Sequence, residues 1–146
     1  MYGIENGSNK ILKLMNKQFT AELAEEVLRN TYEAGIRANF NIIIGFPGET
    51  EIELQESLDF VKRNLAFSQI IALNVLSISK GSDLDINKDK WGIRYQMPDW
   101  ESFDGRNNYN ERLRRLEIYK TIIKDKAYTD AKSISLLEKL RQQSVN

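Results

Sequence analysis

The sequence predicts an α/β fold in which helices alternate with parallel strands. Two apolar runs, Phe40–Ile44 and Ile70–Leu76, are rich in isoleucine and short enough to be buried strands. Between them lies a segment with the spacing of a helix and with a capping signal at its start. A strand, a helix and a second strand in this order indicate parallel strands joined by right-handed crossovers.

Residues 1–78 are predicted to form a βαβαβ segment. After a short first strand, Ser8 and Thr20 are candidate N-caps of two successive helices. The first helix is short, and the second carries apolar residues at helical spacing. These apolar residues are Ile11, Leu12, Leu14 and Met15 in the first helix and Leu23, Ala24, Val27 and Leu28 in the second.

The second strand, Arg37–Ile44, is expected to be covered on both faces, as in parallel sheets. The turn Gly45–Gly48 ends it, and Thr50 with Glu53 has the spacing of a capping box. The helix that follows has one apolar face and leads into the third strand. That face consists of Leu54, Leu58, Val61 and Leu65.

Residues 79–146 are predicted to be an irregular, aromatic-containing segment followed by C-terminal helices. The irregular part, 79–109, contains aromatic side chains that we expect to pack against the domain: Trp91, Tyr95, Trp100, Phe103 and Tyr109. Two helical stripes follow, consisting of Leu113, Leu116, Tyr119, Ile122 and Ile123, and of Ser133, Leu136, Leu137 and Leu140. Because acidic residues flank them, Arg112, Arg114 and Arg115 are predicted to lie on a solvent-exposed face.

Composition excludes several function classes. The 146 residues contain no cysteine and no histidine, so thiol chemistry, Ser-His-Asp hydrolysis and Cys/His zinc sites are excluded for these residues, and no metal ligands are assigned. Twenty-one basic residues balance twenty-one acidic ones, which gives no electrostatic case for nucleic acid or an anionic membrane. With no signal peptide and no long apolar run, a cytoplasmic location is expected.

Two polar clusters follow predicted strands. The first is GIENGS at Gly3–Ser8, which combines a carboxylate, an amide and a hydroxyl with two glycines that permit a ligand to approach closely. The second is IIGFPGET at Ile43–Thr50, where Gly45 leaves the backbone bare for a flat ring. Ligands bind at the carboxyl ends of parallel strands. Taken separately, each cluster is also compatible with a plain strand-to-helix turn.

Taken together, GIENGS, ILKLMNK, EAGIR and IIIGFPGET resemble the radical S-adenosylmethionine (SAM) superfamily, and most closely its members with a cobalamin-binding domain upstream. The resemblance implies the C-terminal half of a TIM-like partial (β/α) barrel with parallel strands, plus a C-terminal helical extension. It also implies an iron–sulfur oxidoreductase or methyltransferase that cleaves SAM reductively to a 5′-deoxyadenosyl radical.

The resemblance assigns a cofactor-binding role to both clusters. Glu5, Asn6 and Ser8 would contact the ribose or amino-acid part of SAM, although Asn6 stands where the family has serine. Ile43 and Gly45 would lie beside the adenine. The complete set of candidate cofactor-binding residues is Glu5, Asn6, Ser8, Asn41, Ile43, Gly45, Phe46 and Pro47.

The family's [4Fe–4S] cluster needs three cysteines spaced C-x3-C-x2-C, and this sequence has none. We therefore expect a fragment that is inactive alone and whose partner is the missing N-terminal half of the barrel. Self-association through exposed edge strands, or a C-terminal segment folded back over the opening, is also expected. Cobalamin is a further cofactor that the resemblance allows. The alternatives are a cluster-free interaction module and a small nucleotide-binding domain.

Overall fold

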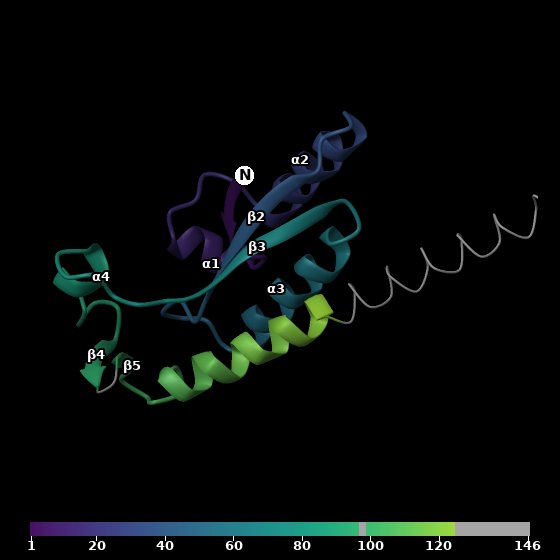
Figure 1. Cartoon of the computed structure of the whole chain (residues 1–146). Helices are drawn as coiled ribbons and strands as arrows, with labels where there is room; N and C mark the ends of the chain where they lie inside the picture. Colours follow the sequence, from purple (N-terminus) through teal and green to yellow (C-terminus); the bar gives the residue numbers. More distant parts are fainter. Residues whose placement is uncertain (97–98, 125–146) are drawn as a thin grey trace, which may run out of the picture.

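The computed structural model describes residues 1–96 and 99–124 (Figure 1). Its centre is a three-stranded sheet in the order β1-β2-β3, formed by β1 (Tyr2–Glu5), β2 (Ala38–Ile44) and β3 (Ser68–Val75). Both strand pairs are parallel. The predicted α/β fold with parallel strands is therefore confirmed, and the described residues form an open sheet of the kind that a partial barrel contains.

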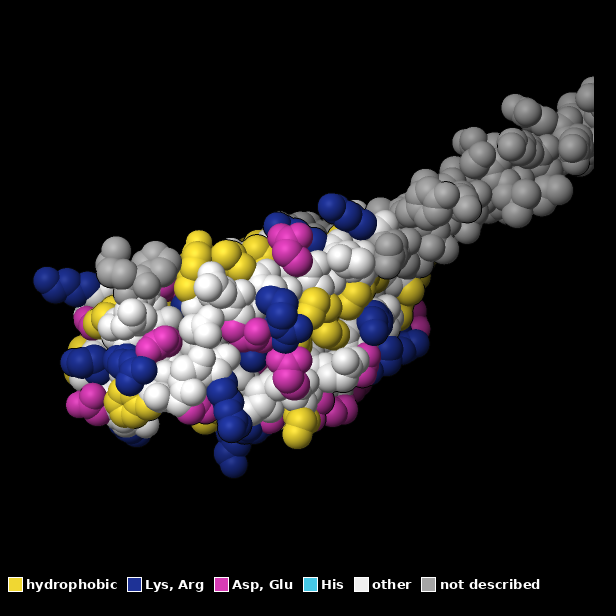
Figure 2. Space-filling model, turned by 90° about the horizontal axis from the view of Figure 1, so that it is seen from below, with side chains coloured by type: hydrophobic (Ala, Val, Ile, Leu, Met, Phe, Trp, Pro, Cys, Tyr) yellow, Lys and Arg dark blue, Asp and Glu magenta, His cyan; other side chains and the backbone are white. Residues whose placement is uncertain are grey.

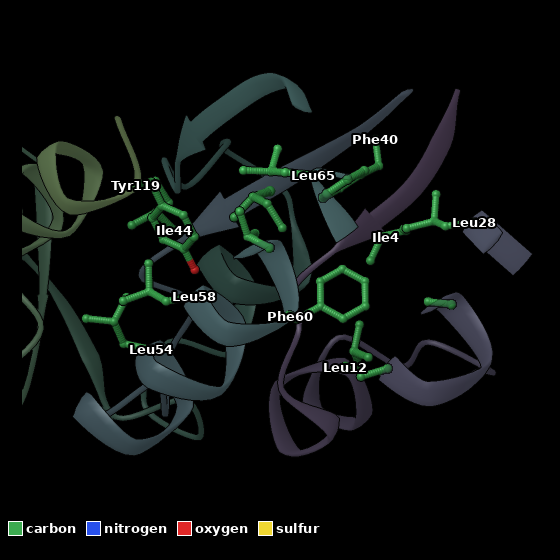
Figure 3. Close-up of a cluster of buried hydrophobic side chains, with 14 of the residues drawn as sticks. Ile4, Leu12, Leu28, Phe40, Ile44, Leu54, Leu58, Phe60, Leu65 and Tyr119 are labelled. Atoms are coloured by element: carbon green, nitrogen blue, oxygen red, sulfur yellow. The ribbon is translucent and has the colours of Figure 1, made fainter. Parts of the chain in front are cut away.

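The main helices lie on one face of this sheet. They are α1 (Asn9–Leu14), α2 (Ala21–Glu33), α3 (Glu51–Asn64) and a helix over 109–124 that runs beside α3 (Figure 1). Each contributes to one apolar core, which Figure 3 shows from within. The side chains at its centre are Ile4, Leu12, Leu28, Phe40, Ile44, Leu58, Phe60 and Tyr119.

The two faces of β2 are buried to different degrees. Ala38, Phe40, Ile42 and Ile44 point to the helical face and are fully buried, while the residues between them are only half-buried. The expectation that this strand is covered on both faces is therefore wrong for the second face. An apolar run alone does not reveal this, because Ile43 is as apolar as its neighbours.

The helix caps follow the predicted chemistry at two of three positions. The Thr20 hydroxyl accepts a hydrogen bond from the Leu23 amide, and Thr50 with Glu53 forms the capping box of α3. Ser8 occupies the N-cap position of α1, but its hydroxyl donates to the Glu56 carboxylate on α3 instead of capping. The prediction for the Ser8 side chain is wrong because a tertiary carboxylate is available to it.

The segment after β3 is more regular than predicted. It contains a short helix, α4 (Asp83–Ile86), and an antiparallel hairpin of β4 (Ile93–Gln96) and β5 (Asp99–Ser102). Trp91 packs edge-on against Phe46, with ring centroids 5.5 Å apart. Buried Trp100 donates its indole N–H to the Leu76 carbonyl at 3.0 Å. Packing is thus confirmed for these two aromatics, whereas the expectation is wrong for Tyr95, Phe103 and Tyr109, which are exposed.

The helix over 109–124 presents the first predicted stripe to the core. Tyr119 is buried, and Leu116, Ile122 and Ile123 pack against the same cluster, while Leu113 is exposed. This part of the C-terminal segment packs beside α3 and not over the second face of the sheet. The second predicted stripe, Ser133, Leu136, Leu137 and Leu140, lies outside the described residues.

Acidic and basic side chains lie interleaved on the face shown in Figure 2. Among the residues that the structure describes, no helix is both long enough and apolar enough to cross a membrane. The cytoplasmic location stays a prediction.

Candidate functional site at the carboxyl ends of the strands

The carboxyl ends of β1 and β2 open into a cavity of about 590 Å³. Three candidate cofactor-binding residues line it: Glu5 from the end of β1, and Ile43 and Phe46 from the end of β2. Segments that the sequence did not connect with a site supply the rest of the wall. These residues are Leu14, Met15, Asn16, Leu76, Ser82, Asp83, Leu84 and Trp91.

Glu5 has an unusual backbone conformation. Its φ is +73°, and the pairing of β1 with β2 shifts register between Tyr2 and Glu5. The Lys17 ammonium lies 3.0 Å from the Glu5 carboxylate and also donates to the Gly3 carbonyl at 3.1 Å. A left-handed conformation costs a non-glycine residue free energy, and such residues cluster at functional sites. Lys17 thus pairs with the carboxylate of a residue whose backbone is strained, at the edge of the cavity.

Asn6 and Ser8 lie behind the wall of the cavity. Both are fully buried. The Asn6 side chain donates to Glu49 at 3.1 Å and accepts from the Ser8 amide at 2.8 Å, and the Ser8 hydroxyl is bonded to Glu56. Their polar groups are therefore hydrogen-bonded within the protein, and their predicted contact with SAM stays a prediction.

Gly7, the second glycine of the first cluster, packs closely against α3. A β-carbon on Gly7 would lie 2.4 Å from the Phe60 β-carbon and 2.8 Å from the Ser57 α-carbon. The Gly7 amide also donates to the Ser57 hydroxyl at 3.0 Å. The close approach predicted for a ligand at Gly7 is therefore made by a helix.

Residues of the second cluster divide between the cavity and its support. Asn41 shares the half-buried face with Ile43, and its side-chain oxygen has no hydrogen-bond partner within the described residues. Gly45 and Pro47 are buried. At Gly45, with φ +82°, a β-carbon would lie 2.4 Å from the Arg112 side chain. Arg112 thus fills the space in which the sequence suggested a flat ring.

A buried ion pair supports both strand ends. The Glu49 carboxylate accepts hydrogen bonds from the Arg115 guanidinium at 2.8 Å, from Asn6 and from the Gly45 amide at 3.2 Å. The Glu49 and Arg115 side chains are 1% and 4% exposed. Burial raises the pKa of Glu49, and Arg115, Asn6 and the Gly45 amide oppose that shift by stabilising the carboxylate.

The sequence predicts that Arg112, Arg114 and Arg115 are solvent-exposed, but two of these three arginines are buried. Arg112 is fully buried and lies over the Trp100 ring at 3.9 Å, and Arg115 pairs with Glu49; Arg114 alone is exposed. The prediction is wrong for Arg112 and Arg115 because their partners lie on other elements. Glu49 belongs to the IIGFPGET motif, but nothing in the sequence around Arg112 and Arg115 indicates that these arginines are buried.

The cavity and the residue types decide which cofactor fits. Apolar walls at Ile43 and Trp91 with polar groups at Glu5 and Ser82 suit a nucleoside, and the volume is that of an ordinary small-molecule pocket. A [4Fe–4S] cluster does not fit these residues, because the sequence has no cysteine or histidine to hold iron. No site for it can be assigned within this chain.

The strands β1 and β2 and the loops that follow them lie in a segment that matches a known protein family. Residues 1–61 match the family model of the radical SAM superfamily.

Similar proteins include enzymes that are named for methylthio groups. A tRNA-2-methylthio-N(6)-dimethylallyladenosine synthase of Thermotoga petrophila is 30% identical over 118 residues, which cover 78% of this chain and 22% of the relative. The synthase of Desulforamulus reducens is 44% identical over 59 residues, covering 39% of this chain and 13% of that protein. The ribosomal protein uS12 methylthiotransferase RimO of Thermosipho africanus is 41% identical over 63 residues, covering 40% and 14%.

The chain spans about a fifth or less of the length of these relatives. The match to the family model ends before β3, so the segment containing Arg112 and Arg115 lies beyond it. The names of these relatives give no support to cobalamin as a cofactor.

Proposed function

We propose that this chain forms one wall of a SAM site in a radical SAM enzyme and is inactive without the cluster-bearing part. The observation that carries the proposal is the cavity at the carboxyl ends of β1 and β2, where Glu5, Ile43 and Phe46 meet. The motifs that contain these residues lie inside the segment that matches the superfamily.

In this proposal the chain's residues bind and orient. Ile43 and Trp91, which both line the cavity, offer apolar surface to the adenine, and Glu5 offers a carboxylate to the ribose or the amino group. None of them is assigned as an acid or base. When bound with a [4Fe–4S] cluster, SAM supplies a carbon-centred radical, and the protein's part is to place it and exclude water.

The named relatives favour methylthio transfer as the reaction of the complete enzyme. Their names assign methylthio groups to tRNA adenosine in two cases and to a ribosomal protein in the third. We propose the reaction class on this basis and assign no acceptor, because the cavity residues described above are proposed to bind the cofactor.

Titration calorimetry with S-adenosylhomocysteine, which lacks the reactive sulfonium, tests the proposal without a cluster. We expect saturable binding, weakened about tenfold by Glu5→Gln, because a charge-assisted hydrogen bond is lost, and also weakened by Ile43→Ala. Ile52→Ala is the control, since Ile52 is exposed on α3 outside this cavity. No saturation at millimolar ligand, or equal affinity in all variants, contradicts the proposal.

A further inference from the structure

A single buried carboxylate connects the two strand ends that carry the site. Glu49 takes one hydrogen bond from Asn6, in the loop after β1, and one from the Gly45 amide, in the loop after β2. The Asn6 side chain also accepts a hydrogen bond from the Ser8 amide, so its position fixes that of Ser8. The positions of both loops therefore depend on where the Glu49 carboxylate lies.

The counter-charge for Glu49 comes from the helix over 109–124. Arg115 donates to the Glu49 carboxylate at 2.8 Å and to its carbonyl at 3.3 Å. Glu111, one turn earlier on the same helix, fixes the Arg115 guanidinium at 2.9 Å. A buried carboxylate without a partner charge is strongly destabilised. The order of the two loops is thus tied to the docking of a helix far from them in sequence.

A second set of contacts from the same segment holds the same loop. The Arg112 side chain covers Gly45, and Asn107 donates to the Gly45 carbonyl at 3.0 Å. Arg112 is itself held by Asp99 at 3.0 Å and by the Trp100 carbonyl at 2.8 Å. Residues of the segment 99–115 therefore contact the loop after β2 at two positions, Gly45 and Glu49.

We propose that Arg115 is a positioning residue which, through Glu49, sets the two loops that form the wall of the cavity. The segment containing it is then part of the site and not a separate extension, although it lies outside the part of the chain that matches the superfamily. Identification of the ligand as SAM rests on the proposed function, but the coupling of Arg115 to both loops does not.

Amide hydrogen exchange on the 146-residue chain tests the coupling without any ligand. In Arg115→Met we expect exchange of residues 4–8 and 45–50 to rise at least about tenfold, because a buried charge loses its partner. Exchange in the core of β2 and α2 should change much less. Arg115→Lys should restore part of the protection, and Arg114→Ala, at the exposed neighbour, should leave both loops within about twofold of wild type.

A double variant guards against simple unfolding. Arg115→Met combined with Glu49→Gln removes both charges, so the fold should persist while both loops still exchange fast. Unchanged exchange in either loop of Arg115→Met overturns the inference, as does a uniform rise across the whole chain in both variants. Binding of S-adenosylhomocysteine, measured in parallel, separates the two claims: absent binding by wild type counts against the proposed function and leaves the exchange result standing.

Discussion

Asn6 shows how one side chain changes role between sequence and structure. In the motif it stands beside Glu5, and the family resemblance places it on the cofactor. In the fold it turns inward to Glu49, while Glu5, in a left-handed conformation, turns to the cavity. One of these two neighbouring polar residues thus holds the loop in place, and the other lines the cavity. Which residue does which depends on the backbone geometry, which sequence spacing does not encode.

Gly7 offers a test of the packing behind the motif. Gly7→Ala should lower the free energy of unfolding by about 2 kcal/mol or more, because the added carbon meets the Phe60 β-carbon and the Ser57 backbone, which have little room to move. Urea denaturation measures this. Gly3→Ala is the matched control, since its nearest contact would be an ordinary 3.5 Å. Equal stability of the two variants would show that α3 does not approach Gly7 this closely.

At the scale of elements, the N-terminus of α3 predicts an acid-sensitive fold. Burial raises the pKa of Glu53, but the hydrogen bonds from Lys10 and Thr50 outweigh it and lower that pKa to about 2. Because the folded-state pKa lies below the unfolded one, the stabilisation is present above about pH 4.5 and lost as pH falls toward 2. Glu111, with its pKa lowered to about 2 by Arg114 and Arg115, acts in the same direction.

Glu53→Gln should therefore cost about 1 kcal/mol at pH 7 and reduce the loss of stability between pH 4.5 and pH 2. Urea denaturation at several pH values measures both effects. Glu26→Gln, on the exposed side of α2, is the control and should follow the wild-type curve. A Glu53→Gln profile parallel to wild type would contradict the assignment.

The elements themselves were largely predictable, and their surroundings were not. The capping box of α3 and the three strands follow from local patterns that the structure confirms. The pairing of β4 with β5 was not predicted because each of these strands buries only one side chain, Ile93 or Trp100, within a largely polar segment. The buried arginines were missed because their partners lie up to 66 residues away along the chain.

The candidate site was predictable only in part. The motifs predict a ligand at the carboxyl ends of the strands, and Glu5, Ile43 and Phe46 do line one cavity there. Trp91 could not be found in this way, because its contact with Phe46 arises from the path of the segment after β3. Tertiary contacts, and not the type of residue, decide which residues line the cavity and which hold its loops in place.

At the scale of the whole molecule, the outer edge of β1 is unpaired within the described residues. Beside it lies an apolar cavity of about 290 Å³, lined by residues that include Ile4, Leu23 and Val27. Leu23 and Val27 are also exposed, which their place in a helical apolar pattern does not suggest. We propose that this edge associates with a second copy or with further barrel strands.

Light scattering on the isolated chain tests this edge. We expect a concentration-dependent dimer or larger species, shifted toward monomer by Val27→Glu, because a charge enters the apolar cavity. Ile52→Glu, at an exposed position on α3, should not change the association. A wild-type chain that stays monomeric at all concentrations would count against self-association.

We propose that these residues are one part of a radical SAM active site whose cluster-bearing part is encoded with them. Sequencing of the DNA immediately upstream of the Met1 codon tests this proposal. We expect an open frame with three cysteines spaced C-x3-C-x2-C within about one domain's length, ~150 residues. An in-frame stop codon close upstream, with no such cysteines, would contradict it.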